Sequence, residues 1–435
     1  MGEEFSCDHS GNVVYCSGAL NIFNSKFVLA EIYKLIRICK YQDITLDFSK
    51  LTRASADGII PVCIDIEKWR KQLEIEIDVV LPRSLTLNRL FFNTNWAHLL
   101  DSKFEESNFS GYSQHPTVRV TNDDDLSTVM KEILECIMMA TRIESYESFA
   151  VVEWSINEII ENILRHSESP FGGLVHMSKF EKTRQIVEVV IADGGIGIPQ
   201  SLRVKDEYKA LSDAALIYKA TQEGVTNGKG QGNGLFGAIS ASKLSGGYCK
   251  IISSYGSLMA FCDKRGLINS TSTTIPFNGS LVCMALNYSN PKILENALKF
   301  TDGIHKPVSA FFDTRYSSDS HCININNEVS SCSTRNSGEK IRNKIDNLIR
   351  VGEAKFITLE FDGKQTITSS FADELFGKLI QIIGIESFYK KIKIVNLSTT
   401  SQFIMERALA IRIKQKDQLE GVQTKMMEIV DELAH

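Results

Sequence analysis

Three segments near the middle of the chain constrain its fold most, because each joins a regular apolar pattern to glycines or polar residues. In the first, apolar residues at helical spacing predict a helix, and Glu158, Asn162 and His166 recur every four residues along one edge of it. The second, residues 185–199, is an apolar strand that ends in DGGIGIP. The third, residues 227–247, is a glycine-rich loop that leads into a helix. Such a loop directs backbone N–H groups toward an anion, and the helix start adds its positive end.

Two common phosphate-binding motifs do not describe the glycine-rich loop. A Walker A loop ends in G-K-[ST], and this loop lacks that ending. A dinucleotide fingerprint follows the first strand of a βαβ unit, and this loop does not. Taken alone, a glycine-rich loop of this kind is also compatible with an ordinary flexible linker.

In their order and spacing the three segments resemble the GHKL superfamily of ATPases and kinases, whose nucleotide-binding domain is the Bergerat fold. EIIENILRHS resembles the N box, DGGIGIP the D-x-G-x-G box and GKGQGNGLFG the G-x-G-x-G-L box. Asn162 and Asp193 are 31 residues apart, and Asp193 and Gly230 are 37 apart, which leaves room for strands and an ATP lid. The resemblance covers residues 124–290 and implies an ATP-binding domain there.

The resemblance also implies roles for the matching residues. Asp193 would accept a hydrogen bond from the adenine amino group, while Gly195 and Gly197 would let the chain pass close to the base. Asn162 would bind Mg²⁺, which prefers oxygen ligands. Glu158 would be the general base, and a carboxylate there would serve hydrolysis or phosphorylation of a hydroxyl equally well.

The remaining implied nucleotide-binding residues are assigned to the phosphates: Arg165, His166, Gly230, Gly232, Gly234 and Leu235. Glu161 lies on another face of the helix, and we expect it to pair with Arg165 one turn later. The spelling E-x-x-x-N-x-x-x-H is most similar to anti-sigma-factor serine kinases, so ATP hydrolysis and serine phosphorylation both stay open.

The two outer parts of the chain share a strand, helix, strand, helix pattern. Strands are predicted at residues 44–48, 74–82, 356–361 and 391–397, and helices at 56–73, 84–100, 369–383 and 399–413. Asp47 to Ser84 is 37 residues, and Glu360 to Thr399 is 39. We infer a divergent internal repeat, with chance as the competing explanation because this element order is common.

Both outer parts resemble STAS domains, through LDFSKLTRASADGII and LEFDGKQTITSSFADEL. The C-terminal one more specifically resembles a STAS-like domain of unknown function. Where a STAS substrate carries its phosphorylatable serine, the first copy has Asp57 and the second has Ser370 beside Ser369. These residues are regulatory candidates. Helix capping is the alternative role of the serines, and a favourable helix-dipole contact that of Asp57.

The expected fold class is α/β, an α+β sandwich with a central Bergerat-fold domain between two smaller STAS-like domains. A STAS-like domain is expected at residues 1–115 and the ATP-binding domain at 124–290. Residues 291–338 are expected to form a linker and loop region, because 317–338 is rich in Ser and Asn. A second STAS-like domain is expected at 339–435.

The amino-acid composition limits the classes of molecule that the chain is expected to bind. The 48 Lys and Arg and 53 Asp and Glu residues are scattered, so nucleic acid is not an expected partner. The ten cysteines include no C-x-x-C pair, and no apolar stretch is long enough to cross a bilayer. We expect a cytoplasmic protein with no membrane partner. The expected ligands are ATP and Mg²⁺, with a protein partner at the STAS-like domains and a homodimer left open.

The leading hypothesis is a nucleotide-controlled signalling switch that hydrolyses ATP or phosphorylates serine. The alternative is a dimeric GHKL gate or conformational machine without kinase activity, such as gyrase B. In that class a lysine from the following part reaches the γ-phosphate, and Lys355 or Lys364 would be the candidate. A histidine kinase is disfavoured because residues 124–148 contain no histidine.

Overall fold

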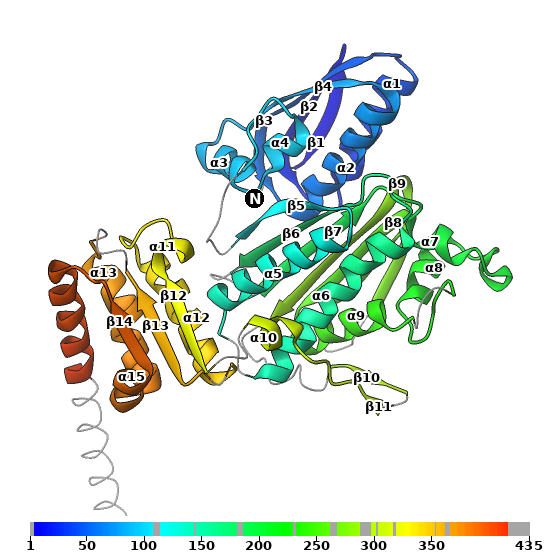
Figure 1. The fold of residues 1–435 in the computed structure, drawn as a ribbon. Coiled ribbons are helices and arrows are strands. Elements are labelled where there is room, and N and C mark those ends of the chain that lie inside the picture. The colour runs from blue at the N-terminus through cyan, green and yellow to red at the C-terminus, as the bar shows by residue number, and fades with distance from the viewer. Residues whose placement is uncertain are drawn as a thin grey trace, which may run out of the picture. The chain divides into compact units, whose positions relative to one another are not determined.

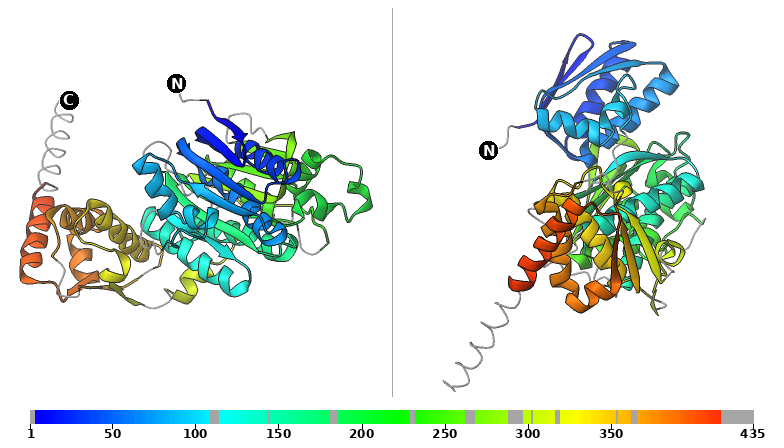
Figure 2. Two further views of the ribbon diagram at one scale, coloured as in Figure 1. Left: turned by 90° about the horizontal axis from the view of Figure 1, so that it is seen from above. Right: turned by 60° about the vertical axis from the view of Figure 1, so that its left-hand side comes forward.

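The computed structural model divides into two compact units, which are described separately (Figure 1, Figure 2). Unit 1 comprises residues 1–109, 114–133 and 147–308, and unit 2 comprises residues 110–113, 134–146 and 309–435. The structure describes residues 4–107, 114–142, 145–180, 186–228, 232–261, 268–287, 297–301, 303–315, 319–352, 354–361 and 366–415. Among these, no helix has the length and apolar content that crossing a bilayer requires.

Unit 1 begins with a four-stranded sheet in the order β1-β2-β3-β4, in which β1 is antiparallel to β2 and the other pairs are parallel. Its strands are β1 (Ser6–Ser10), β2 (Val13–Leu20), β3 (Asp43–Ala54) and β4 (Glu76–Val80). Its helices are α1 (Ser25–Arg37), α2 (Ala56–Leu73), α3 (Leu85–Asn93) and α4 (Trp96–Leu100). The predicted helix at 56–73 is confirmed. The one predicted at 84–100 is broken at Asn95, whose φ of 67° is a left-handed conformation that asparagine tolerates.

The second sheet of unit 1 has five strands in the order β5-β6-β7-β9-β8, and all its neighbours are antiparallel. They are β5 (Gln114–Val120), β6 (Gly173–Phe180), β7 (Ile186–Asp193), β8 (Tyr248–Phe261) and β9 (Ile268–Asn287). The helices along it are α5 (Asp123–Ala140), α6 (Tyr146–His166), α7 (Gly197–Leu202), α8 (Asp213–Ala220) and α9 (Gly234–Ser245). A short hairpin follows, formed by β10 (Lys299–Phe300) and β11 (Gly303–Ile304).

Strand β7 is covered on both faces, which explains why its sequence is almost continuously apolar. All eight of its residues are buried. Side chains alternate along a strand, so Ile191 and Asp193 face one side while Val190 and Ala192 face the other. The first pair lines a cavity beneath α6, and the second belongs to one hydrophobic core with α2 and the four-stranded sheet.

Helix α2 attaches the four-stranded sheet to the five-stranded one. Near its start, Asp57 Oδ2 lies 2.7 Å from the Nζ atom of Lys250 in β8. At its C-terminal end, Glu67 pairs with Arg119 of β5 at 2.5 Å. The predicted division between residues 1–115 and 124–290 therefore separates two sheets that share one core within unit 1.

Unit 2 contains a three-stranded parallel sheet in the order β12-β13-β14. Its strands are β12 (Ser320–Asn324), β13 (Phe356–Glu360) and β14 (Ile392–Val395). Its helices are α10 (Ala310–Arg315), α11 (Ile325–Glu328), α12 (Arg335–Arg350), α13 (Ser369–Ala372), α14 (Lys378–Ile383), α15 (Ile385–Lys391) and a last helix over residues 399–415, with a π-helical turn at Asp373–Gly377. The strand, helix, strand order is the same as that of β2 to β4, and the internal repeat stays a prediction.

Part of the predicted linker is regular structure. Residues 317–338, read as a loop from their Ser and Asn content, contain β12, α11 and the start of α12. Strand β12 is polar because it lies at the edge of the sheet, where Ile323 is its only fully buried residue and its backbone pairs with β13. Backbone pairing between strands does not depend on side-chain polarity, so the polar composition of this segment did not indicate that β12 is a strand.

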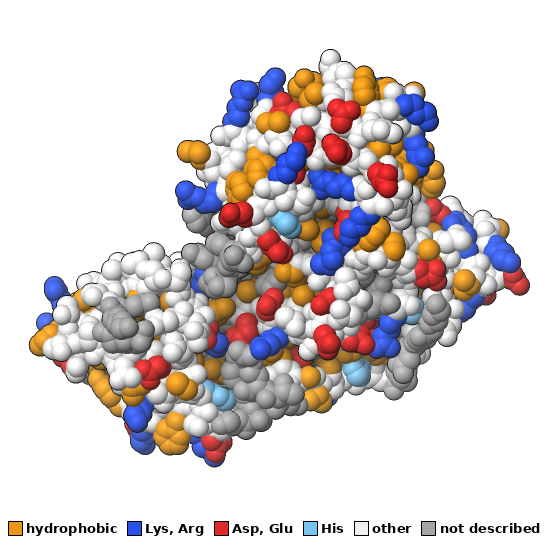
Figure 3. All heavy atoms as spheres, turned by 45° about the horizontal axis from the view of Figure 1, so that its top comes forward, with side chains coloured by type: hydrophobic (Ala, Val, Ile, Leu, Met, Phe, Trp, Pro, Cys, Tyr) orange, Lys and Arg blue, Asp and Glu red, His pale blue; other side chains and the backbone are white. Residues whose placement is uncertain are grey.

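The mixed α/β class is confirmed. Basic and acidic side chains lie interspersed on the face shown in Figure 3, as the scattered charges of the sequence predict.

Candidate functional site

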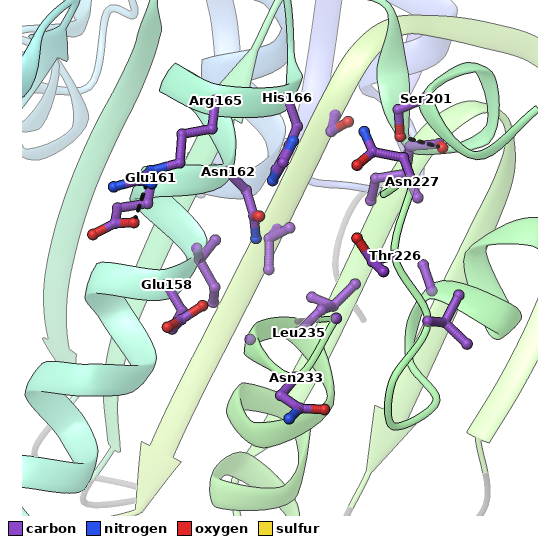
Figure 4. A pocket seen from close by; sticks show the side chains of 18 of the residues that line it. Glu158, Glu161, Asn162, Arg165, His166, Ser201, Thr226, Asn227, Asn233 and Leu235 are labelled. Carbon is purple, nitrogen blue, oxygen red and sulfur yellow. Dashed lines mark hydrogen bonds and ion pairs between the residues drawn. The ribbon is translucent and has the colours of Figure 1, made fainter. Parts of the chain in front are cut away.

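A cavity of about 560 Å³ lies in unit 1, within the range of about 300–1,000 Å³ usual for small-molecule sites. Its walls come from α6, the end of β7, α7, the loop before α9, the first turn of α9 and the β10–β11 hairpin. Figure 4 shows Glu158 and Asn162 on α6 across from Asn233 and Leu235 at the start of α9. Three segments that are distant in sequence therefore meet at one place.

Most of the predicted site residues line this cavity: Glu158, Asn162, Arg165, His166, Asp193, Gly197, Gly232, Gly234 and Leu235. Gly195 is not among the residues that line the cavity. Its backbone N–H donates a hydrogen bond to the Asp193 Oδ1 atom at 2.8 Å. Gly230 lies outside the described residues.

The helical edge predicted for Glu158, Asn162 and His166 is present. Side chains four residues apart on α6 point to the same wall, so Trp154, Glu158, Asn162 and His166 all reach the cavity. The expected pair between Glu161 and Arg165 is confirmed, with the Arg165 Nε atom 3.0 Å from Glu161 Oε2 (Figure 4).

Asp193 places a buried carboxyl group at the end of β7. Its side chain is 4% exposed, and burial raises its pKa to about 6. Hydrogen bonds from the backbone N–H groups of Gly195 and Ser280, and the charge of Lys68, act in the opposite direction. The group therefore remains ionised at neutral pH in a largely dry setting, where an acceptor discriminates strongly between ligand donors.

Close packing within the protein leaves no room for a side chain at two of the glycines after Asp193. A Cβ atom at Gly195 would lie 1.9 Å from the carbonyl oxygen of Ser167, and Ile196 N–H donates to that same oxygen at 2.7 Å. Gly197 has φ +80°, and a Cβ there would lie 2.7 Å from Ser253 Oγ. The loop thus packs against the end of α6 and against β8, a reason for glycine beyond the approach to a base that the resemblance implies.

Glu158 lies against the first residue of α9. A Cβ atom at Gly234 would be 2.3 Å from Glu158 Oε2, so a larger residue there would displace this carboxylate from its position. Burial and the neighbouring Glu161 raise the pKa of Glu158, while Arg165 lowers it. A half-buried carboxylate with a raised pKa at a helix N-terminus suits proton transfer near an anion.

The sequence analysis missed one wall of the cavity. Phe300, Gly303, Ile304 and His305 line it from the β10–β11 hairpin, within the predicted linker region. No motif marks these residues. Trp154 was also missed, although its position four residues before Glu158 on the same helical edge pointed to the site.

The regulatory candidates have different environments. Asp57 is buried, accepts a hydrogen bond from Ser55 Oγ at 2.5 Å and pairs with Lys250 on the sheet face opposite the cavity. Ser369 is exposed and Ser370 half-buried at the start of α13. The helix cap is Thr368, so capping does not explain either serine.

The alternative of an ATPase gate, with Lys355 or Lys364 at the γ-phosphate, stays a prediction. Lys355 pairs with Asp319 at 2.7 Å within unit 2, and Lys364 lies outside the described residues.

Comparison with known proteins identifies one part of the chain. A family described as a STAS-like domain of unknown function (DUF4325) matches residues 337–402. No curated protein matches the chain. Residues 337–402 are therefore STAS-like, as the sequence predicts for the C-terminal part.

Proposed function

We propose that the cavity of unit 1 binds Mg²⁺-ATP, and that nucleotide state controls contacts of the STAS-like parts with a protein partner. The observation that carries this proposal is the meeting of α6, the end of β7 and the start of α9 around one cavity of suitable size. A fold that served only packing would not need polar groups from three separated segments around a cavity.

Asp193 suits the adenine end of such a ligand. Its carboxylate is buried beside the apolar side chains of Ile191, Ile198 and Val282, which also line the cavity. An exocyclic amino group would donate to the carboxylate, whereas a carbonyl at the same place would face another acceptor and have no donor. Leaving a buried acceptor unpaired costs about 1–3 kcal/mol, which predicts preference for adenine over guanine.

The start of α9 suits the phosphate end. Its first N–H groups are available to an anion, and the helix adds positive potential. The amide oxygen of Asn162 is the kind of oxygen ligand that Mg²⁺ prefers. When bound, the ion would neutralise part of the phosphate charge. Glu158 is placed to take a proton from water or from a substrate hydroxyl.

Binding is tested by calorimetry with ATP, ADP and GTP in the presence of Mg²⁺. We expect Asp193→Asn to remove the preference for ATP over GTP, and Asn162→Ala to weaken ATP binding while affecting ADP less. Asn157→Ala is the control on the same helix, because Asn157 is not among the residues that line the cavity. Wild-type affinities in both site variants would refute nucleotide binding here.

Turnover is tested separately with Glu158→Gln. Removing a general base lowers rate by about 10²- to 10⁴-fold with little effect on ground-state affinity. An end-point assay that separates released phosphate from protein-bound phosphate then distinguishes an ATPase from a serine kinase. Unchanged turnover in Glu158→Gln would remove this residue from the mechanism.

A further inference from the structure

The β10–β11 hairpin forms one wall of the cavity and contacts the two helices α6 and α9. The Phe300 ring lies 6.3 Å from the ring of Trp154 on α6 and 5.8 Å from that of Phe236 on α9. The backbone N–H of Thr301 donates to Glu223, just before the glycine-rich loop, at 2.5 Å. The hairpin therefore contacts both helices that carry the predicted phosphate-end residues, and also the segment that leads into the loop.

His305, directly after the hairpin, is held by the same aromatic cluster. Its ring centroid lies 5.6 Å from that of Trp154 and 6.2 Å from that of Phe300. Its backbone N–H donates to the carbonyl of Leu298 at 2.9 Å, which closes the base of the hairpin. His305 lines the cavity, and its imidazole ring can offer an N–H donor to a ligand there.

The position of His305 along the cavity follows from α6. Trp154 is one helical turn before Glu158 on the same edge, and Glu158 lies against Gly234 at the start of α9. The His305 ring packs against Trp154 in a tilted arrangement, so it belongs to the end of the cavity that holds Glu158 and the α9 N-terminus. Asp193 lies at the end of β7 and defines the other end.

We infer that His305 contacts the terminal phosphate of the bound nucleotide, so that the hairpin distinguishes a triphosphate from a diphosphate. This inference rests on the proposed function. Its physical basis is that a side-chain donor at the anion-binding end adds a charge-assisted hydrogen bond, which ADP would not receive.

The test compares affinities for ADP and for a non-hydrolysable ATP analogue, AMP-PNP, with Mg²⁺ and the full chain. His305→Ala should weaken AMP-PNP binding by about tenfold to a hundredfold, the usual effect of a hydrogen bond to a charged group, with ADP binding within about twofold of wild type. His305→Gln keeps a side-chain N–H donor and should recover part of the loss. Lys306→Ala changes the next residue, which is exposed and does not line the cavity, and should change neither affinity.

Two results would overturn the inference while leaving the proposed function intact. Equal losses for ADP and AMP-PNP in His305→Ala would mean that the ring only supports the hairpin through Trp154. Unchanged affinities for both would mean that the ring makes no contact with nucleotide. If the wild-type protein binds neither nucleotide, the proposed function itself fails.

Discussion

The buried carboxyl group of Asp65 should make unit 1 less stable at alkaline pH than at acidic pH. Asp65 lies in α2, is 2% exposed, and its Oδ1 atom has no hydrogen-bond partner among the residues that the structure describes. Burial raises its pKa to about 7, and the charge of Lys68 only partly opposes this. Replacing the carboxyl by an amide in Asp65→Asn removes the ionisation with little change of shape.

The size of the effect follows from the two pKa values. The pKa is 3.8 for the unperturbed group and about 7 in the folded protein. Because the folded value is the higher one, the contribution of this group is fully present below about pH 4 and is lost as pH rises toward 7. At about 1.4 kcal/mol for each pH unit between the two values, ionisation costs about 4 kcal/mol at pH 8 but only about 2 kcal/mol at pH 5.

The assay is urea unfolding followed by tryptophan fluorescence. All three tryptophans, Trp69, Trp96 and Trp154, lie in unit 1, so the signal reports that unit. The difference in unfolding free energy between Asp65→Asn and wild type should grow by about 3 kcal/mol from pH 5 to pH 8. Asp206→Asn is the control, because its side chain is 92% exposed and should change the difference little. A difference that stays constant with pH would refute the reasoning.

Three further predictions concern the site and the core behind it. Gly234→Ala should displace the Glu158 carboxylate and lower ATP turnover by about tenfold or more at an unchanged urea midpoint, and normal turnover would contradict the contact. Asp57→Ala should lower the unfolding free energy by about 3–5 kcal/mol, because Lys250 loses its partner. The double variant with Lys250→Met should recover much of this loss, and additive losses would argue against a buried pair. ATP affinity measured by calorimetry should fall as pH drops from 7.5 to 5, in part because Asp193 becomes protonated near pH 6, and the fall should be smaller in Asp193→Asn.

Local patterns in the sequence determined several elements correctly. Residues 56–73 form α2 at the predicted bounds even though Pro61, the sixth residue of the helix, has no backbone N–H to donate. The four-residue spacing of Glu158, Asn162 and His166 placed them on one edge of α6, because helical periodicity is a property of the backbone. The sequence likewise predicted a STAS-like domain in the C-terminal part, where the family match covers residues 337–402.

Other features depended on contacts between distant segments. The polar residues of β12 gave no strand signal, because an edge strand is held by backbone pairing with β13. The helix cap proved to be Thr368 instead of either serine beside it, a choice made by backbone geometry at one position. The hairpin that carries His305 has no motif, because its place in the cavity wall comes from aromatic packing against α6 and α9.

The sequence by itself determined which local element most of the candidate residues occupy, since helices and strands follow from residue type and short-range periodicity. Only the tertiary structure decided what surrounds them. Asp57 begins its helix as predicted, yet its burial against Lys250 arises because α2 packs on the five-stranded sheet. Gly195 follows Asp193 in a recognisable motif, yet the Ser167 carbonyl that excludes a side chain there belongs to another segment. Such constraints depend on close packing between parts far apart in the chain, and one-dimensional periodicity does not encode them.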